Sequence, residues 1–362
     1  MFEARRERLA QLLQQGGTDA CVIVPGPNLY YFTGLSLKQS ERLSLAIITR
    51  ENQLLFLVPQ VEVSKVEKLA HDHLFWYTDE QGPLKALTEL IKALGKVDSI
   101  GVEHGHMRVM ELKAVEQLGA AGYIAIDNAV DQLRVIKDQQ EIDAIQRAVR
   151  IVEESFEATL PSIREGVAEL EIAAELEYEM RKRGSEGTPF GTIVASGYRG
   201  ALPHGRASDK LIKSGELIVL DFGAYYQGYV ADITRTVAIG ELASELAKIY
   251  EIVRQAQQAA VDAVRPGVTA HEIDETARSI IRDRGYGDYF THRLGHGIGL
   301  SGHEEPYMRQ QNRLLLEPGM AFTIEPGIYL PDKGGVRIED NVIVTEDGCL
   351  NLMTLTKELI SL

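Results

Sequence analysis

Residues 217–237 read LIVLDFGAYYQGYVADITRTV, two mainly apolar runs on either side of a short turn-forming stretch. This pattern predicts a β-hairpin. If the strands pair at equal distances from a turn centred between Tyr226 and Gln227, Asp221 and Asp232 face each other with Cβ atoms about 5 Å apart. Two carboxylates at that distance repel by roughly 3 kcal/mol at an effective dielectric constant of 20. Because the apolar neighbours indicate burial, we expect either a protonated carboxyl or a cation between the two groups.

A second stretch repeats this geometry. Residues 322–340 read FTIEPGIYLPDKGGVRIED, in which Pro-Asp-Lys-Gly-Gly predicts a turn centred on Asp332. Strands that pair around this centre bring Glu325 opposite Glu339. A purely structural hairpin has no reason to oppose carboxylates, and here two hairpins do so. We therefore interpret the four acidic residues as parts of one site.

A histidine lies between the two hairpins in the sequence. Residues 292–306 read HRLGHGIGLSGHEEP, in which His296 is flanked by glycines that allow the backbone a close approach. One imidazole and four carboxylates form an oxygen-rich ligand set whose four negative charges neutralise two divalent cations. Such a set favours Mn²⁺, Co²⁺ or Mg²⁺ over a thiolate zinc centre without excluding zinc. Two metals that share a water can generate a nucleophile and stabilise a developing oxyanion.

The ordered set of motifs resembles the pita-bread metallopeptidases, in particular their prolidase and aminopeptidase P branch. The motifs are Asp221 and Asp232 with ten residues between them, Gly-His-Gly around His296, Glu-Pro-Gly from Glu325 and Arg-Ile-Glu-Asp from Arg337. The resemblance covers essentially the whole chain. It implies an α/β (α+β) protein with a creatinase-like N-terminal α/β domain, a linker from Arg134 to Lys137, and a C-terminal pita-bread domain with an internal pseudo-two-fold duplication.

The resemblance also implies a dinuclear metal site. Asp221 and Asp232 are then ligands of one metal, and Asp232 and Glu339 bridge to the other. The second metal is bound by Asp232, His296, Glu325 and Glu339. The cofactors implied are two divalent metal ions, Mn²⁺ or Co²⁺ in the first place and Zn²⁺ in the second. Thr234 shares the strand face of Asp232 and is expected to hydrogen-bond a ligand, whereas Arg235 points to the opposite face and serves structure.

The same resemblance implies the catalytic residues. His204, in the sequence LPHGR, looks like the substrate histidine of the family, and His303 looks like its second catalytic histidine. Glu325 is expected to move a proton from the nucleophile to the leaving nitrogen. Arg337 shares a strand face with Glu339 and could bind a substrate carboxylate. His292 is expected to line the substrate. The implied function is hydrolysis of the Xaa-Pro bond, with a hydroxide shared by both metals as nucleophile, in a dipeptidase or an aminopeptidase.

The length of the chain and its patterns predict two domains. A chain of 362 residues exceeds the usual size of one hydrophobic core. Residues 1–128 are expected to form an α/β domain, because five β-branched runs alternate with helical stretches such as residues 83–94. The runs cover residues 20–24, 43–48, 54–58, 99–102 and 123–126. The boundary is expected within residues 127–134, so that residues 129–362 form the catalytic domain, which begins with a helix over residues 137–159.

Residues 164–184 and 265–285 resemble each other at an offset of 101 positions. The matches include Gly166 with Gly267 and Gly184 with Gly285, and each copy reads as a turn, an amphipathic helix and a terminating glycine. This repeat indicates a duplicated unit with a site at its centre.

Composition limits the partners. The net charge of −15 disfavours nucleic acid and anionic membranes. The two cysteines have neither disulfide-framework nor zinc-ligand spacing. We find no signal-peptide pattern and no run of about 18 apolar residues, and therefore expect a cytoplasmic protein. The expected partner is a small proline-containing peptide, and the resemblance implies a homodimer.

Three other functions are weighed against this one. A methionine aminopeptidase-like enzyme has the same five ligands but, as a family, lacks the large N-terminal domain. A creatinase-like amidinohydrolase has both domains but loses the metal ligands, all of which are present here. A catalytically inactive pita-bread binding module is disfavoured by the intact ligands. The sequence leaves open the length of the Xaa-Pro substrate, the residue before proline and the metal used.

Overall fold

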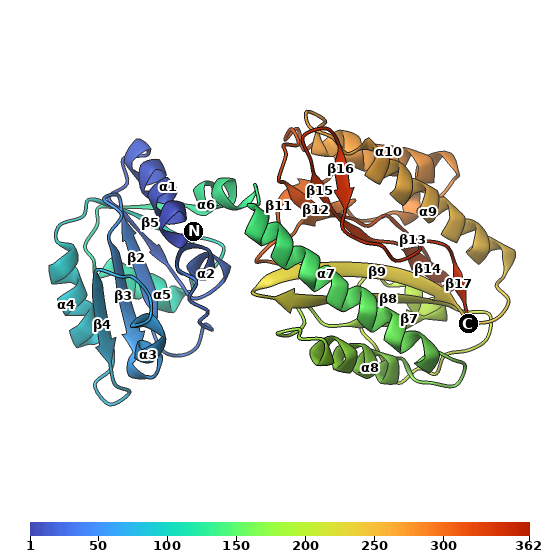
Figure 1. Cartoon of the computed structure of the whole chain (residues 1–362), viewed down its shortest axis with the longest axis horizontal. Coiled ribbons are helices and arrows are strands. Elements are labelled where there is room, and N and C mark those ends of the chain that lie inside the picture. Colours follow the sequence, from blue (N-terminus) through green and yellow to red (C-terminus); the bar gives the residue numbers. More distant parts are fainter. The chain divides into compact units, whose positions relative to one another are not determined.

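The computed structural model describes residues 1–362 and divides into two compact units, Met1–Arg134 and Val135–Leu362 (Figure 1). Helix α6 (Asp127–Arg134) belongs to the first unit. The division therefore follows this helix, at the end of the range 127–134 in which the boundary was expected. No helix combines the length and the apolar character that crossing a membrane requires.

The first unit is built on a six-stranded mixed sheet with the strand order β4-β3-β2-β1-β5-β6. Its strands are β1 (Ala20–Ile23), β2 (Leu45–Thr49), β3 (Leu54–Pro59), β4 (His73–Tyr77), β5 (Ser99–Val102) and β6 (Gly122–Ala125). Its other helices are α1 (Phe2–Gln15), α2 (Pro27–Thr33), α3 (Val63–Val66), α4 (Leu84–Leu94) and α5 (Val109–Glu116). The α/β prediction is confirmed, and five of its strands and the helix α4 lie within about two residues of the expected ranges.

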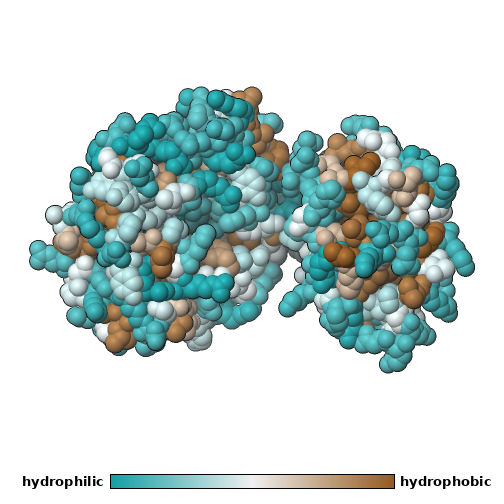
Figure 2. All heavy atoms as spheres, turned by 180° about the vertical axis from the view of Figure 1, so that it is seen from behind, coloured by the Kyte–Doolittle hydropathy of each residue, from teal (hydrophilic) through white to brown (hydrophobic).

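Strand β4 was not predicted. It is an edge strand that pairs in parallel with β3, from Leu55 opposite His73 to Pro59 opposite Tyr77. Most of its side chains are half-buried or exposed, and Trp76 is 47% exposed. An edge strand of this kind lacks the apolar alternation by which strands are recognised in a sequence. Figure 2 shows apolar patches on the surface of this unit among predominantly hydrophilic side chains.

The second unit contains a four-stranded sheet, a five-stranded sheet and a two-stranded ladder. Their orders are β17-β9-β8-β7, β11-β10-β12-β15-β16 and β13-β14. The bounds are β7 (Ile193–Ser196), β8 (Leu217–Tyr226), β9 (Tyr229–Ala238), β10 (Gly295–Gly297), β11 (Glu304–Met308), β12 (Ala321–Ile324), β13 (Gly327–Leu330), β14 (Gly334–Arg337), β15 (Asp340–Val344), β16 (Cys349–Asn351) and β17 (Ile360–Ser361). Helices α7 (Gln139–Thr159) and α8 (Glu169–Lys182) accompany the first sheet, and α9 (Ser244–Ala263) and α10 (Ala270–Asp283) the second (Figure 1).

The structure confirms the internal duplication. In one copy the N–H of Gly166 donates to Ile212 O at 2.9 Å, and in the other the N–H of Gly267 donates to Leu316 O at 2.9 Å. Helices α8 and α10 then begin three residues after these glycines, and each is followed by a glycine of positive φ, Gly184 or Gly285. The two copies therefore share the turn, the helix start and the helix end. This is the order of elements that the sequence repeat predicted.

The register of the β8–β9 hairpin corrects one prediction. Asp221 pairs with Thr234, and Asp232 pairs with Gly223, so the expected direct opposition of the two aspartates is wrong. The turn consists of Gln227 and Gly228 alone, both with positive φ (49° and 77°), as in the two-residue turns whose twist suits a hairpin. The centre therefore lies one position later than expected. Because the partner shifts by two residues, and side chains alternate with a period of two, both carboxylates still lie on one face.

The register of the second hairpin agrees with the expected centre at Asp332. Gly327 pairs with Arg337 in the β13–β14 ladder, and Ile324 pairs with Asp340 in the β12–β15 ladder. Glu325 and Glu339 lie between these two ladders, at equal distances from the turn. Both glutamates therefore lie where the chain passes from the β12–β15 ladder to the β13–β14 ladder.

Candidate metal centre

A cavity of about 580 Å³ lies in the second unit. All nine residues that the sequence analysis assigned to a site line it, namely His204, Asp221, Asp232, His292, His296, His303, Glu325, Arg337 and Glu339. The remaining lining residues are Phe190, Gly191, Ile193, Pro203, Arg206 and Arg293. Side chains from both halves of the duplicated unit therefore meet in one cavity.

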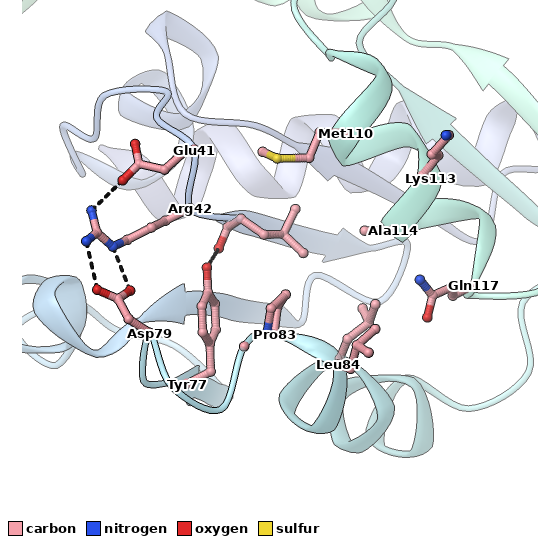
Figure 3. Close-up of a pocket in the computed structure, with 13 residues that line it drawn as sticks. Glu41, Arg42, Tyr77, Asp79, Pro83, Leu84, Met110, Lys113, Ala114 and Gln117 are labelled. Carbon is pink, nitrogen blue, oxygen red and sulfur yellow. Dashed lines mark hydrogen bonds and ion pairs between the residues drawn. The ribbon is translucent and has the colours of Figure 1, made fainter.

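Another cavity, of about 550 Å³, lies in the first unit and contains none of these residues (Figure 3). Its walls are mainly apolar, with Leu84 and Met110 among them. Its two carboxylates are both paired with Arg42, which binds Asp79 through two hydrogen bonds of 2.8 Å and Glu41 through a third. This cavity therefore presents no unpartnered carboxylate for a metal, and we place the candidate site in the second unit.

The glycines around His296 are required by close packing. A Cβ atom on Gly295 would lie 2.0 Å from Thr323 O, and one on Gly297 would lie 2.2 Å from Glu305 O. Strand β10 therefore fits between β11 and β12 only without side chains at these positions. His296 is the one residue of this short strand with a side chain, and it is 3% exposed.

Three carboxylate oxygens in the cavity are buried without a hydrogen-bond partner. They are Asp221 Oδ1, Asp232 Oδ1 and Glu339 Oε1. Ligand atoms of Asp232, His296 and Glu339 also lie within 4.8 Å of one another. Burial of charged oxygens without partners is costly unless a cation compensates them. These residues therefore fit divalent metal ions.

Burial and the charge of a neighbouring carboxylate shift the pKa values of Asp232 and Glu339. Burial raises the pKa of Asp232 well above its usual value, and the charge of Asp221 adds to the shift. Burial also raises the pKa of Glu339 well above its usual value, and there the charge of Asp232 is the next cause. Each carboxylate thus makes its neighbours harder to ionise, and a cation placed between them reverses this effect.

Glu325 differs from the other acids because it faces histidine. Its Oε1 lies 3.3 Å from His296 Nε2, which is 3.9 Å from Asp232 Oδ2. Burial acts to raise the pKa of Glu325, but the hydrogen bond and charge of His296, with the charges of His292 and Arg337, lower it to about 2. Glu325 is therefore an ionised carboxylate at neutral pH.

Hydrogen bonds orient the acidic side chains. Thr234 Oγ1 donates to Glu339 Oε2 at 2.8 Å, as its position on the strand face predicted. Arg235 points away and forms a buried ion pair with Asp340 at 2.8 Å, also as predicted. The sequence analysis missed Asn341, which accepts from Asp232 N at 3.0 Å and donates to Asp232 O at 2.7 Å. Its place two residues after Glu339, on the same strand face, was the available signal.

Arg337 is held by protein acceptors. Its guanidinium makes four hydrogen bonds, to Asp221 Oδ2 at 2.5 Å, Tyr329 OH at 2.8 Å, Thr234 Oγ1 at 3.1 Å and Pro203 O at 3.2 Å. The side chain thereby joins the first hairpin, the second hairpin and the loop that carries His204. A guanidinium has five N–H donors, so one of them is left for another acceptor.

Tyr329 is a second residue that the sequence analysis missed. Because Arg337 can only donate, Tyr329 OH accepts from it and donates its own hydrogen to His292 Nε2 at 2.8 Å. His292 Nδ1 then carries the proton and donates to Arg293 O at 2.7 Å. Burial lowers the pKa of His292, in agreement with a neutral ring. An aromatic residue in a strand usually indicates packing, so the sequence held no signal for this link.

We expect Tyr329→Phe to lower the free energy of unfolding by about 1–3 kcal/mol, because Arg337 loses an acceptor and His292 loses a donor in a buried place. Urea unfolding of the purified protein measures the change. Tyr225→Phe is the matched control, because Tyr225 is half-buried in β8 and its hydroxyl has no hydrogen-bond partner in the structure. An equal free energy of unfolding in the two variants would contradict the hydrogen-bonded link from Arg337 through Tyr329 to His292.

The two remaining histidines border the cavity. The ring of His303 lies 3.9 Å from that of His296, centroid to centroid, and its Nδ1 lies 3.2 Å from Arg293 Nη2. Because Arg293 donates, the proton of a neutral His303 is on Nε2. Burial, with the charges of His296 and Arg293, lowers the pKa of His303 to about 4. His204 is exposed in the loop after β7, at the cavity wall.

Both units of the chain match known protein families. Residues 143–346 match metallopeptidase family M24, and residues 5–136 match the creatinase/prolidase N-terminal domain. The chain belongs to metallopeptidase family M24. This M24 chain is therefore a peptidase of a metal-dependent family, and the predicted fold and enzyme class are confirmed.

Relatives resemble this M24 chain along its whole length. An Xaa-Pro dipeptidase of Pyrococcus horikoshii is 39% identical over 98% of both chains. The solved structure of an Xaa-Pro dipeptidase from Bacillus anthracis superposes with a TM-score of 0.92 at 37% identity and covers 100% of both chains. That of an X-Pro aminopeptidase from Thermotoga maritima has a TM-score of 0.88 at 39% identity and covers 99% of both chains.

Proposed function

We propose that this metallopeptidase hydrolyses the peptide bond before proline in small Xaa-Pro substrates, as an Xaa-Pro dipeptidase. One observation carries the proposal: the acidic residues and His296 meet at one cavity in a chain that resembles Xaa-Pro dipeptidases from end to end. The match to a creatinase/prolidase N-terminal domain argues against a methionine aminopeptidase-like enzyme, because that family lacks such a domain. Hydrolysis of Ala-Pro in the presence of divalent metal tests the proposal.

An Xaa-Pro aminopeptidase is the second candidate. The observation that favours it is the similarity to the X-Pro aminopeptidase of Thermotoga maritima, at an identity equal to that of the Pyrococcus dipeptidase. The two activities differ in the length of peptide that follows the scissile bond. A length series of Xaa-Pro peptides, assayed with Mn²⁺, Co²⁺ and Zn²⁺, separates them and identifies the preferred metal.

The metal site we propose has five ligands, and two divalent ions would occupy it. The unpartnered oxygens of Asp221, Asp232 and Glu339 support this set. The full set is Asp221, Asp232, His296, Glu325 and Glu339. We propose Mn²⁺ or Co²⁺, because carboxylate oxygens predominate and no thiolate is present among the residues that line the cavity. When bound, such ions supply an activated water and stabilise negative charge on oxygen.

The other side chains have roles in the proposed reaction. Glu325, the ionised carboxylate, accepts the proton of the attacking water and passes it to the proline nitrogen as the C–N bond breaks. His303 donates its Nε2 hydrogen to the oxyanion that forms on the substrate carbonyl. His204, in the loop after β7, holds the substrate. His292, fixed as a neutral ring by Tyr329, forms part of the substrate wall.

The role of Arg337 is narrower than the sequence suggested. Its four hydrogen bonds to protein acceptors support a positioning role, in which it holds one oxygen of Asp221 and leaves the other for metal. One N–H is left for a substrate carboxylate. We therefore propose that Arg337 contributes at most a single hydrogen bond to a bound dipeptide.

We expect His204→Ala and His303→Ala each to lower kcat by about a hundredfold or more, the usual scale for one oxyanion or proton-transfer contact. Neither residue is a proposed ligand, so metal affinity should be unchanged in both variants. Steady-state kinetics and calorimetric metal titration measure the two quantities. His104→Ala, at an exposed position of the first unit, serves as control. Wild-type turnover in both variants would remove these residues from the mechanism.

We propose a homodimer that acts in the cytoplasm. The net charge of −15 and two free cysteines, of which Cys21 is buried, support a reducing compartment without nucleic-acid or membrane partners.

A further inference from the structure

A buried ion pair lies outside the proposed ligand set. Lys137 Nζ is 2.9 Å from Glu304 Oε1, and the two side chains are 1% and 7% exposed. Lys137 belongs to the segment that begins the second unit at Val135, and 167 positions separate it from Glu304. A buried ion pair rarely stabilises more than an apolar pair of similar size would, because both charges lose their hydration. We therefore ask which parts of the structure this ion pair holds in position, rather than how much stability it adds.

Glu304 closes the loop that carries His303. It follows His303 directly, pairs with Gly297 at the start of β11, and accepts a hydrogen bond from Ser301 N at 3.2 Å through Oε2. A Cβ atom on Gly299 would lie 2.5 Å from Glu304 Oε1, so the loop admits this carboxylate only with glycine there. The carboxylate thus lies inside the turn between β10 and β11.

The same loop is joined to the metal-binding strands. Val230 N donates to Gly299 O at 2.8 Å, two residues before Asp232 on β9. Across the loop, the ring of His303 lies 3.9 Å from the ring of His296. A shift of the turn would therefore move His303 relative to the proposed ligands.

The backbone of Lys137 is fixed independently of its side chain. Lys137 N donates to Gly319 O at 2.9 Å, and Ile136 forms a β-bridge with Met320, next to the start of β12. The ammonium group also donates to Val135 O at 3.3 Å. The ammonium group of Lys137 therefore has a fixed position, and its ion pair with Glu304 can hold the loop in place.

We propose that Lys137 is a positioning residue, which acts through Glu304 to hold the 298–303 loop so that His303 stays over His296. The inference rests on the catalytic role proposed for His303. Lys137 does not reach the cavity itself, since it is absent from the cavity lining. The first residues of the second unit thereby become part of the support of the active site.

A double-mutant cycle between Lys137 and His303 tests the proposal. We expect Lys137→Met to lower kcat on Ala-Pro by about 10- to 100-fold, the effect of a misplaced catalytic group, while metal affinity and KM change little. In a His303→Ala background the same substitution should have almost no further effect, because its target is gone. Glu304→Gln, which keeps the size of the side chain, should reproduce the result if Lys137→Met folds poorly.

Two outcomes would overturn the proposal. If the effects of Lys137→Met and His303→Ala multiply, Lys137 has only a general structural role. Wild-type kcat in Lys137→Met and Glu304→Gln would show that the loop does not need the pair. Arg254→Met is the control, because it removes a partly buried arginine paired with Glu251 on α9, far along the chain from this loop.

Hydrogen exchange separates this proposal from the proposed function. Amides of residues 298–305 should exchange faster in Lys137→Met than in the wild type, while those of α9 keep their rates. If the wild type hydrolyses no Xaa-Pro peptide, the proposed function is wrong, and faster exchange in the variant still supports the anchoring of the loop. Unchanged exchange in the loop would contradict that anchoring whatever the activity.

Discussion

Asp232→Asn is expected to lower divalent-metal affinity by about a hundredfold or more and to abolish turnover with it, since loss of a mere supporting contact already costs about 10- to 100-fold. Asp232 is 5% exposed, and its Oδ1 has no protein partner. Ligand atoms of Asp232, His296 and Glu339 lie within 4.8 Å of one another, close enough to hold a metal ion together. Asp221→Asn should have a smaller effect, because one oxygen of Asp221 is already bound by Arg337.

Calorimetric titration with Mn²⁺ and with Co²⁺ measures the affinities and the number of ions bound. Asp209→Asn, an exposed aspartate of the same unit, controls for loss of charge. Absence of metal binding by the wild type, or equal affinity in the Asp232 variant, would contradict the proposed ligand set. The expected order of affinity is wild type, then Asp221→Asn, then Asp232→Asn.

Ala-Pro is expected to be hydrolysed with a kcat/KM about 100- to 1,000-fold above that of Ala-Ala. The proline nitrogen carries no hydrogen, so a site made for it needs no acceptor for a peptide N–H at that point. The N–H of Ala-Ala would enter this site unsatisfied, at a cost of about 1–3 kcal/mol. The pyrrolidine ring also adds apolar contact, worth about 0.8 kcal/mol for each buried methylene.

Kinetics on paired peptides of equal length check the expected preference. Ala-Pro and Ala-Ala form the first pair, and Ala-Pro-Ala and Ala-Ala-Ala the second. Comparable efficiency on both members of a pair, or a preference for N-terminal methionine, would exclude an Xaa-Pro peptidase even with both metals bound. Strong preference for the longer proline peptide would favour the aminopeptidase over the dipeptidase.

The periodicity of strands explains why the sequence predicted the acidic cluster despite an error of register. Asp221 was placed opposite Asp232, and its partner is Thr234. The error is an even number of residues, which leaves both carboxylates on one face. The exact pairing depended on whether Gln227 adopts a positive φ, and only Gly228 beside it signals such a turn.

Local patterns with a period of two or 3.6 residues were sufficient to predict the helices, the strands and the shared strand faces of the acidic residues. The fold and the domain types were implied by the resemblance that the ordered motifs carry. The tertiary structure alone decided which partners the polar groups take. Arg337 binds Asp221 across 116 positions, and Lys137 binds Glu304 across 167. Such pairs depend on how whole elements pack, and no local pattern specifies them. The link from Arg337 through Tyr329 to His292, and the anchoring of the His303 loop, therefore emerged only once the sheets of the second unit were assembled.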